Sequence, residues 1–207
     1  MNKRGVLTVI SGFSGAGKGT LVKELVRKYD YKLSVSATTR QPREGECDGK
    51  DYFFLTTEKF ESMIENGQFF EWAKYVGNYY GTPREFVEQQ LNEGNDVILE
   101  IEIQGALKMK EQFPDILLLF ITPPNAEELK NRLVRRNTED METITKRLKR
   151  AEEEAEFMDR YDYIDINDDL DECVQNTHTL IQNYKAKTSN CADFIREMQA
   201  QLKKLNQ

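Results

Sequence analysis

The segment that most constrains this chain is a glycine-rich stretch near its start. It runs through Gly12, Phe13, Ser14, Gly15, Ala16, Gly17, Lys18, Gly19 and Thr20. An apolar run at residues 6–10 comes directly before it, and residues 21–26 after it have the spacing of an amphipathic helix. A strand, a glycine-rich loop and a helix in this order are the context of a phosphate-binding P-loop. Glycines let backbone N–H groups approach the phosphates, and the helix N-terminus adds partial positive charge.

One position departs from the usual P-loop pattern, G-x-x-x-x-G-K-[ST]. Lys18 supplies the mobile charge for the outer phosphates, but Gly19 stands where the pattern has a hydroxyl. Thr20 follows at once and is the candidate to take over the contact to Mg²⁺, directly or through water. The alternative is a glycine-rich turn before an ordinary helix, which Lys18 and the preceding strand disfavour.

Length and charge limit the remaining possibilities. A chain of 207 residues fits one domain with a sizeable core. The net charge of −7 disfavours nucleic acid and anionic membranes as partners. Cys47, Cys173 and Cys191 lie far apart without metal-site spacing, which favours a reducing compartment. No signal-peptide pattern and no apolar run near 18 residues is present. We therefore expect a soluble cytoplasmic protein.

Short apolar segments alternate with amphipathic ones along the chain. This alternation predicts an α/β fold with a mostly parallel sheet covered on both faces. Expected core strands are residues 6–10, 33–36, 97–101, 116–121 and 163–166. Expected helices run from the P-loop to about residue 29, from Thr82 to Gly94, from Asn125 onward, and over residues 141–158. At the second of these, Thr82 is expected to cap the helix, with Pro83 in the first turn and Glu85 completing a capping box.

Residues 38–80 have a different pattern. A polar loop at 38–51 leads to an apolar segment at 52–55, a helix ending near Gly67, and a segment at 69–76. Gly77-Asn78 predicts a hairpin turn. We interpret the region as a small strand-rich insertion, and such insertions often carry substrate recognition.

A second notable stretch, residues 132–150, is rich in arginine. Its arginines are Arg132, Arg135, Arg136, Arg147 and Arg150, on both sides of a polar turn at 137–140. Alone, such a charge run is more often a solvated pair of helices. Beside a P-loop it is better interpreted as a lid that closes over phosphates.

Several further segments, in order, resemble the guanylate kinase family over residues 5 to about 185. They are the P-loop and residues 34–43, 45–46, 49–52, 70–73, 77–82, 99–105 and 166–169. A P-loop alone indicates only a nucleoside triphosphate, whereas this ordered set is specific. The resemblance implies a P-loop NTPase-like core at 5–37 and 82–186, a GMP-binding insertion at 38–81 and a lid at about 132–150. These belong to one domain, residues 1–207, and a helical tail follows at 190–207.

The resemblance assigns the acceptor site to named residues. The family holds the GMP phosphate with residues at the positions of Arg40, Arg43, Tyr52 and Tyr80, and it contacts the guanine with Ser36, Glu71 and Thr82. The chemistry supports these roles independently. Arginine grips phosphate through two parallel charged hydrogen bonds. A carboxylate accepts from the adjacent N1–H and amino donors of guanine, and adenine has an acceptor at N1 instead.

Two further residues of the GMP site, Glu100 and Glu102, and the residues of the donor side are assigned in the same way. Glu100 and Glu102 match the acidic pair near Mg²⁺, its waters and the GMP ribose, although the family usually has Asp at the second position. Asn167 resembles the residue near the adenine of ATP. Arg132, Arg136 and Arg147 resemble the lid and donor-site arginines. Of all these residues, Lys18, Arg40, Arg136 and Arg147 are the candidates for catalysis, and Arg150 is expected to be a surface charge.

The implied activity is ATP-dependent, Mg²⁺-assisted phosphorylation of GMP, and of dGMP as well, to the diphosphate. Two alternatives stay open: a related domain that only binds proteins, and a kinase for a phosphorylated sugar. The intact P-loop disfavours the first, and Glu71 with Ser36 and Thr82 would have no use in the second.

Two features lie outside this assignment. The lone His178 is expected to be an ordinary helix residue. In the tail, Ile195, Met198, Leu202 and Leu205 form one apolar stripe on a helix. A helix docked on its own domain is the favoured interpretation and an oligomer contact the alternative, so the sequence leaves open whether the protein is a monomer or an oligomer.

Overall fold

The computed structural model describes residues 4–75, 77–135 and 140–206, and its centre is a five-stranded sheet. The strands are β1 (Leu7–Gly12), β2 (Lys32–Leu33), β7 (Val97–Glu100), β8 (Leu117–Thr122) and β9 (Tyr163–Ile166). Their order is β2-β7-β1-β8-β9, and every pair is parallel. The α/β fold with a parallel sheet is thereby confirmed. The strand expected at 33–36 is shorter because the chain leaves this sheet after Leu33 and enters a second one at Ala37.

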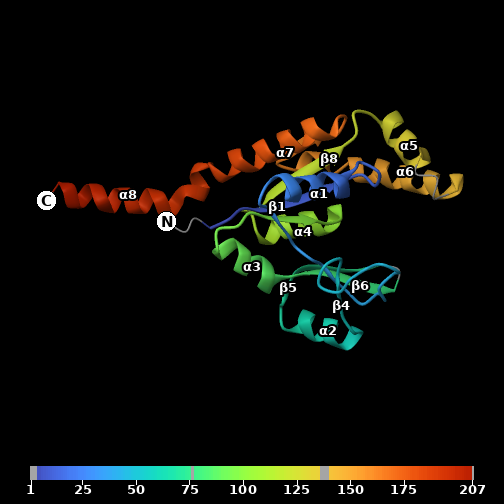
Figure 1. Cartoon of the computed structure of the whole chain (residues 1–207), viewed down its shortest axis with the longest axis horizontal. Coiled ribbons are helices and arrows are strands. Elements are labelled where there is room, and N and C mark those ends of the chain that lie inside the picture. Colours follow the sequence, from blue (N-terminus) through green and yellow to red (C-terminus); the bar gives the residue numbers. More distant parts are fainter. Residues whose placement is uncertain (1–3, 76, 136–139, 207) are drawn as a thin grey trace.

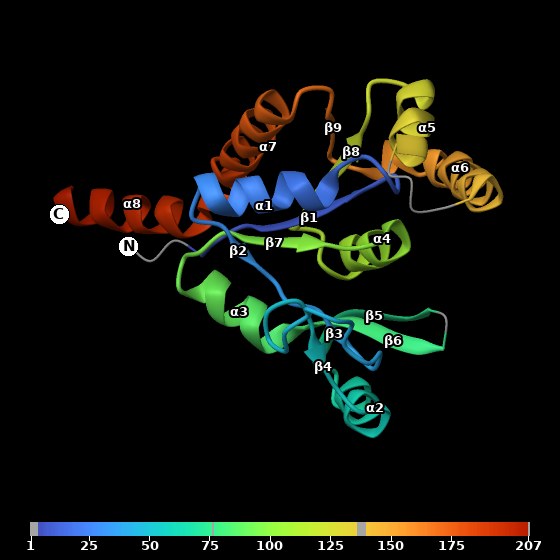
Figure 2. The same cartoon turned by 45° about the vertical axis from the view of Figure 1, so that its right-hand side comes forward.

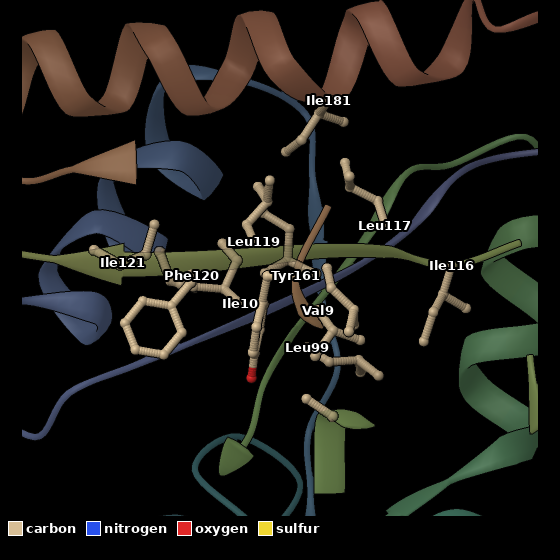
Figure 3. Packing of buried hydrophobic residues seen from close by; sticks show 14 of the residues in the cluster. Val9, Ile10, Leu99, Ile116, Leu117, Leu119, Phe120, Ile121, Tyr161 and Ile181 are labelled. Carbon is tan, nitrogen blue, oxygen red and sulfur yellow. The ribbon is translucent and has the colours of Figure 1, made fainter. Parts of the chain in front are cut away.

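Helices cover both faces of the central sheet, as Figures 1 and 2 show. On one face α1 (Lys18–Lys28) lies beside α7 (Leu170–Lys185), and on the other lies α4 (Ile103–Gln112). Because both faces are covered, β1 and β8 are apolar along most of their length instead of alternating. Figure 3 shows this packing, in which Val9, Ile10 and Phe120 are fully buried.

A second, four-stranded sheet lies to one side of the core (Figure 1). Its strands are β3 (Ala37–Thr38), β4 (Phe53–Phe54), β5 (Phe69–Tyr75) and β6 (Asn78–Pro83), in the order β4-β3-β6-β5. The helix α2 (Thr57–Glu65) packs on it through the fully buried Phe60, which stacks on Phe69 at 4.3 Å between ring centroids. The turn expected at Gly77-Asn78 joins β5 and β6, and Gly77 takes a positive φ of 80° there.

The start of α3 (Arg84–Asn92) differs from the expectation. The residue at the N-cap is Pro83, and no side chain caps the helix. Thr82 belongs to β6, and its hydroxyl points instead to the carboxylate of Glu71. The capping role expected for Thr82 is therefore wrong.

The arginine-rich stretch contains two helices. They are α5 (Ala126–Arg135) and α6 (Met141–Ala155), and a short 3-10 helix, η1 (Met158–Arg160), follows α6. The predicted helix at 141–158 was therefore too long, whereas the start expected at Asn125 is confirmed by its side chain accepting from the Glu128 N–H at 2.8 Å. Arg136 lies outside the described residues.

The tail forms α8 (Ala192–Leu205) after a 3-10 turn, η2 (Thr188–Cys191). It extends away from the core in Figure 1, and none of its residues is buried. The stripe residues Met198 and Leu202 are exposed. The favoured interpretation of a helix docked on its own domain is therefore wrong. Among the described residues, no helix combines the length and apolar character needed to cross a membrane.

Candidate active site

The P-loop lies where β1 ends at the centre of the sheet, and its shape depends on glycine at two points. Gly12 and Gly17 have positive φ angles of 145° and 91°. A Cβ atom at Gly12 would lie 2.0 Å from the carbonyl oxygen of Ile121, and one at Gly17 would lie 2.5 Å from Asn167 Nδ2. Lys18 Nζ donates to the carbonyl oxygens of Gly12 (2.7 Å) and Phe13 (3.0 Å). The lysine therefore sits over its own loop, within reach of any phosphate that the loop binds.

Neighbouring elements hold this loop in place. The buried Asn167, just after β9, donates from Nδ2 to the Ala16 carbonyl at 2.8 Å. From α6, Arg147 Nη1 donates to Ser14 Oγ at 3.3 Å. Asn167 and Arg147, both predicted on the donor side, are thus brought to the P-loop from distant parts of the chain.

Glu100 lies at the carboxyl end of β7, the neighbour of β1. A Cβ atom at Gly19 would lie 3.7 Å from one carboxylate oxygen of Glu100, an ordinary van der Waals distance, so the Glu100 side chain lies beside the first turn of α1. Desolvation raises the pKa of Glu100, Lys18 opposes this, and Glu102 adds to it. Thr20 is exposed in the first turn of α1. The described part of the chain contains no cluster of three or more His, Cys, Asp or Glu side chains suited to a metal ion.

Glu102 forms an ion pair with Arg150, a residue that we expect from the sequence to be a surface charge. Arg150 Nη2 on α6 donates to Glu102 Oε2 at 2.6 Å, and Arg150 Nε donates to Glu154 Oε1 at 2.8 Å. Glu154 is buried, which raises its pKa, while Arg150 lowers it. Arg150 is the surface charge that the sequence predicts, with 42% of its side chain exposed, and it also joins α6 to the acidic pair through Glu102.

Glu71 on β5 and Thr82 on β6 face each other across the antiparallel pair. Thr82 Oγ1, fully buried, donates to Glu71 Oε1 at 2.8 Å. Burial raises the pKa of Glu71, while the Thr82 hydroxyl and Lys108 lower it. The second carboxylate oxygen faces α4, where a Cβ atom at Gly105 would lie 3.1 Å from it. One oxygen is thus fixed by the protein, and the absence of a side chain at Gly105 keeps space beside the other.

A second group of side chains in the second sheet consists of Arg40 after β3, Tyr52 before β4 and Tyr80 on β6. The guanidinium of Arg40 makes a two-bond fork with Glu46, at 3.0 Å in each bond, and lies 5.4 Å from the ring centroid of Tyr52. The rings of Tyr52 and Tyr80 are 6.2 Å apart. Burial raises the pKa of Tyr52, and both Glu46 and Tyr80 raise that of Arg40. A carboxylate in such a fork has the geometry in which arginine also binds phosphate.

Three other predicted residues, Arg43, Ser36 and Arg132, make only local contacts. Arg43 is exposed, and its backbone N–H donates to Glu46 Oε2 at 2.7 Å. Ser36 is half-buried between the two sheets, where its carbonyl accepts from the Phe53 N–H at 2.9 Å. Arg132 on α5 pairs with Glu128 of the same helix at 2.8 Å.

Sequence reasoning assigned no role to Glu46, Gly105 or Arg150. Glu46 and Gly105 lie inside two of the matched segments, so their positions pointed to the site although their roles were not evident. Arg150 had no such signal, because its partner Glu102 is far away in the sequence and only the fold brings them together.

Comparison with known proteins decides the family. A family model described as guanylate kinase matches residues 4–184. The chain belongs to the guanylate kinase family. A guanylate kinase of Caldanaerobacter subterraneus subsp. tengcongensis is 54% identical over 201 residues, covering 95% of this chain and 98% of the relative. One from Streptococcus thermophilus is 50% identical and covers 96% of each chain.

A solved structure agrees with this assignment. The crystal structure of guanylate kinase from Anaplasma phagocytophilum superposes with a TM-score of 0.72 at 33% identity, covering 90% of this chain and 89% of the other. The resemblance inferred from the motifs is confirmed. For a guanylate kinase family member, the two places described here, the P-loop and the second sheet, are the natural candidates for the two nucleotide sites.

Proposed function

We propose that this enzyme transfers the γ-phosphoryl group of ATP to GMP, giving ADP and GDP, and that it accepts dGMP as well. The observation that carries the acceptor assignment is the pair formed by Glu71 and Thr82. A carboxylate with one oxygen held by a buried hydroxyl at 2.8 Å and the other beside Gly105 suits a base with two adjacent donors. Guanine has that pair at N1 and the amino group. Adenine would leave the buried carboxylate without one partner, which such a site penalises strongly.

The rest of the acceptor site is suited to the phosphate of GMP. Arg40 would exchange its fork with Glu46 for a fork with the phosphate, and Arg43, Tyr52 and Tyr80 would add donors. Ser36 would donate to the guanine oxygen, and Glu102 would lie near the ribose. Thr82 has one hydroxyl proton, which Glu71 accepts, so joining Ser36 would require that proton to turn to the guanine oxygen. The carboxylate of Glu46 holds the Arg40 guanidinium by two hydrogen bonds before the substrate binds.

The transfer itself needs no general base. The nucleophile is a phosphate oxygen of GMP that is already anionic near neutral pH, so catalysis consists of alignment and charge stabilisation. Lys18 would leave the loop carbonyls to contact the transferring group, and Arg132, Arg136 and Arg147 would approach from the lid. Closure of the lid and of the second sheet would exclude water, which would otherwise take the phosphoryl group.

We further propose that Mg²⁺ enters with ATP. The residues fit such an ion: Glu100 extends over Gly19 toward the P-loop, and Thr20 is one residue on. Mg²⁺ is commonly held by one or two carboxylates together with substrate phosphates and waters. When bound, it would supply positive charge between the phosphates, with Glu100 and Thr20 holding it directly or through water.

The test is a coupled ADP-release assay with Mg·ATP and a panel of acceptors: GMP, dGMP, AMP, UMP, CMP and a phosphorylated pentose. We expect turnover with GMP and dGMP far above that with AMP. Turnover with the sugar alone would overturn the acceptor assignment. Binding of GMP without turnover of any acceptor would overturn the proposed reaction and favour a binding domain.

A further inference from the structure

We propose that Arg150 is a positioning residue of the acceptor site. It holds the carboxylate of Glu102 against the lid helix α6 and offsets its charge where the anionic acceptor must arrive. This inference rests on the proposed function, since it concerns how GMP enters beside the acidic pair at the end of β7.

The first support is the way α6 attaches to the core. Arg147 and Arg150 lie one turn apart on α6, and each contacts a different part of the site. Arg147 bonds to Ser14 of the P-loop, and Arg150 bonds to Glu102 after β7. Glu154, one turn further, accepts from Arg150 Nε at 2.8 Å, and its side chain is only 8% exposed. Arg150 is thus anchored on its own helix while its outer nitrogen reaches across to Glu102.

The second support is the length of the side chain at position 102. Glu102 occupies the N-cap of α4 but makes no capping bond. A shorter Asp would suit that cap, because N-cap oxygens bond to the N–H groups two or three residues on. The extra methylene of Glu102 instead lets its carboxylate meet Arg150 at 2.6 Å. Glu102 and Arg150 therefore act as a pair, with the helix cap left unmade.

The third support is the local charge. Glu100 and Glu102 lie at the same end of β7, and Glu102 is close enough to raise the pKa of Glu100. Lys18 and Lys23 offset part of the charge of Glu100. The phosphate of GMP carries up to two negative charges, so an uncompensated Glu102 near its path would weaken its binding. Arg150 compensates Glu102 from α6 and leaves most of the Glu102 side chain open, since that side chain is 75% exposed.

A double-mutant cycle tests the inference on the full chain. The variants are Arg150→Met, Glu102→Gln and the two combined. The matched control is Arg160→Met, which breaks an ion pair of comparable exposure between Arg160 and Glu111 at 3.0 Å. The readouts are KM for GMP, kcat, and the Kd for GMP from the fluorescence of the sole tryptophan, Trp72, the neighbour of Glu71.

At low salt we expect Arg150→Met to raise both KM and Kd for GMP about 5- to 10-fold, with kcat within about two-fold, and the effect to shrink at high salt. In the Glu102→Gln background the same substitution should change KM less than about two-fold, because the charge to be offset is gone. Arg150→Lys should restore part of the affinity, and Arg160→Met should leave it unchanged.

If the wild-type enzyme phosphorylates GMP, two results would overturn the role of Arg150 and leave the proposed function intact. One is an unchanged KM and Kd in Arg150→Met, which would make the bridge a surface ion pair without effect. The other is an equal loss with and without the Glu102 charge. A wild-type chain that binds no GMP would overturn the proposed function and this inference with it.

Discussion

Replacing Glu71 by Gln tests the guanine assignment with one nitrogen-for-oxygen exchange. Thr82 Oγ1 lies 2.8 Å from Glu71 Oε1, and an amide oxygen at that place can still accept its hydrogen bond. The amide nitrogen must then face Gly105, where the second carboxylate oxygen now stands. It would present donors to the donors of guanine. Size and shape barely change, so any effect comes from hydrogen-bond polarity.

The magnitude follows from the bonds that are lost. A hydrogen bond to a charged group contributes about 1.5–3 kcal/mol, and a neutral one about 1 kcal/mol. The variant loses one charged bond to the base and weakens the other, a total of about 2–4 kcal/mol. This corresponds to a fall of about 30- to 700-fold in kcat/KM for GMP. The value for AMP should rise, because the amide can donate to N1 of adenine.

The Glu71→Gln variant should be more stable than the wild type, although it is less active on GMP. Burial raises the pKa of Glu71 above its ordinary value, so the charged carboxylate disfavours the folded state at neutral pH. The stability that this group contributes is present below the ordinary glutamate pKa and is lost as the pH rises through the raised value. The amide that replaces the carboxylate carries no charge, so Glu71→Gln should melt at a higher temperature than the wild type at pH 7.5.

The assay is coupled ADP release at pH 7.5 with GMP and AMP, together with thermal melts. Glu61→Gln is the control, since Glu61 also accepts a hydroxyl bond, from Tyr79 at 3.1 Å, but lies exposed on α2. An unchanged ratio of GMP to AMP turnover in Glu71→Gln would refute the assignment of the base reader.

Three further predictions concern the donor site, the space beside the base and the pH response. Lys18→Ala should lower kcat at saturating substrates by at least about 100-fold, because one charge on the transferring group is lost, and unchanged turnover would remove Lys18 from the site. Gly105→Ala should raise the free energy of unfolding, measured in urea, by about 0.5–1 kcal/mol because alanine has the higher helix propensity. The same variant should raise KM for GMP because the new Cβ displaces Glu71. An unaltered KM would contradict this role of Gly105. Burial lowers the pKa of His178, which bonds to Tyr31 Oη at 2.7 Å, so its contribution to stability is lost as the pH falls below the ordinary histidine value. The free energy of unfolding of the wild type should therefore fall more steeply between pH 7.5 and 5.5 than that of His178→Asn. Equal pH slopes of the two proteins in urea melts would contradict this role of His178.

The parts of the fold that the sequence predicts well are those with local patterns. The strand, loop and helix around Lys18 carry their own signal, and the buried strands of a parallel sheet are continuous apolar runs. The hairpin turn at Gly77 is equally local. Residues Glu71, Arg40 and Asn167 could be assigned only because they stand within an ordered set of family motifs.

The errors arose where distant contacts override local preferences. Thr82 has the sequence context of a helix cap, but the charged partner offered by Glu71 across the hairpin competes successfully for its hydroxyl. Arg150 is a surface charge as the sequence indicates, but only the fold shows that Glu102 is its partner. For α8, the periodic stripe indicated a helix, yet periodicity cannot show whether a surface is available to receive it.

The order of strands in the central sheet has a consequence for synthesis of the chain on the ribosome. β1 is the first strand to be made, but its two neighbours are β7 and β8, and Gly12 packs against Ile121. The strand and its loop therefore wait for most of the polypeptide before they can be held in shape. The hairpin of β5 and β6 pairs nearby residues and can form much sooner. We therefore expect the acceptor end of the enzyme to take shape while the ATP site, although encoded first, is still incomplete.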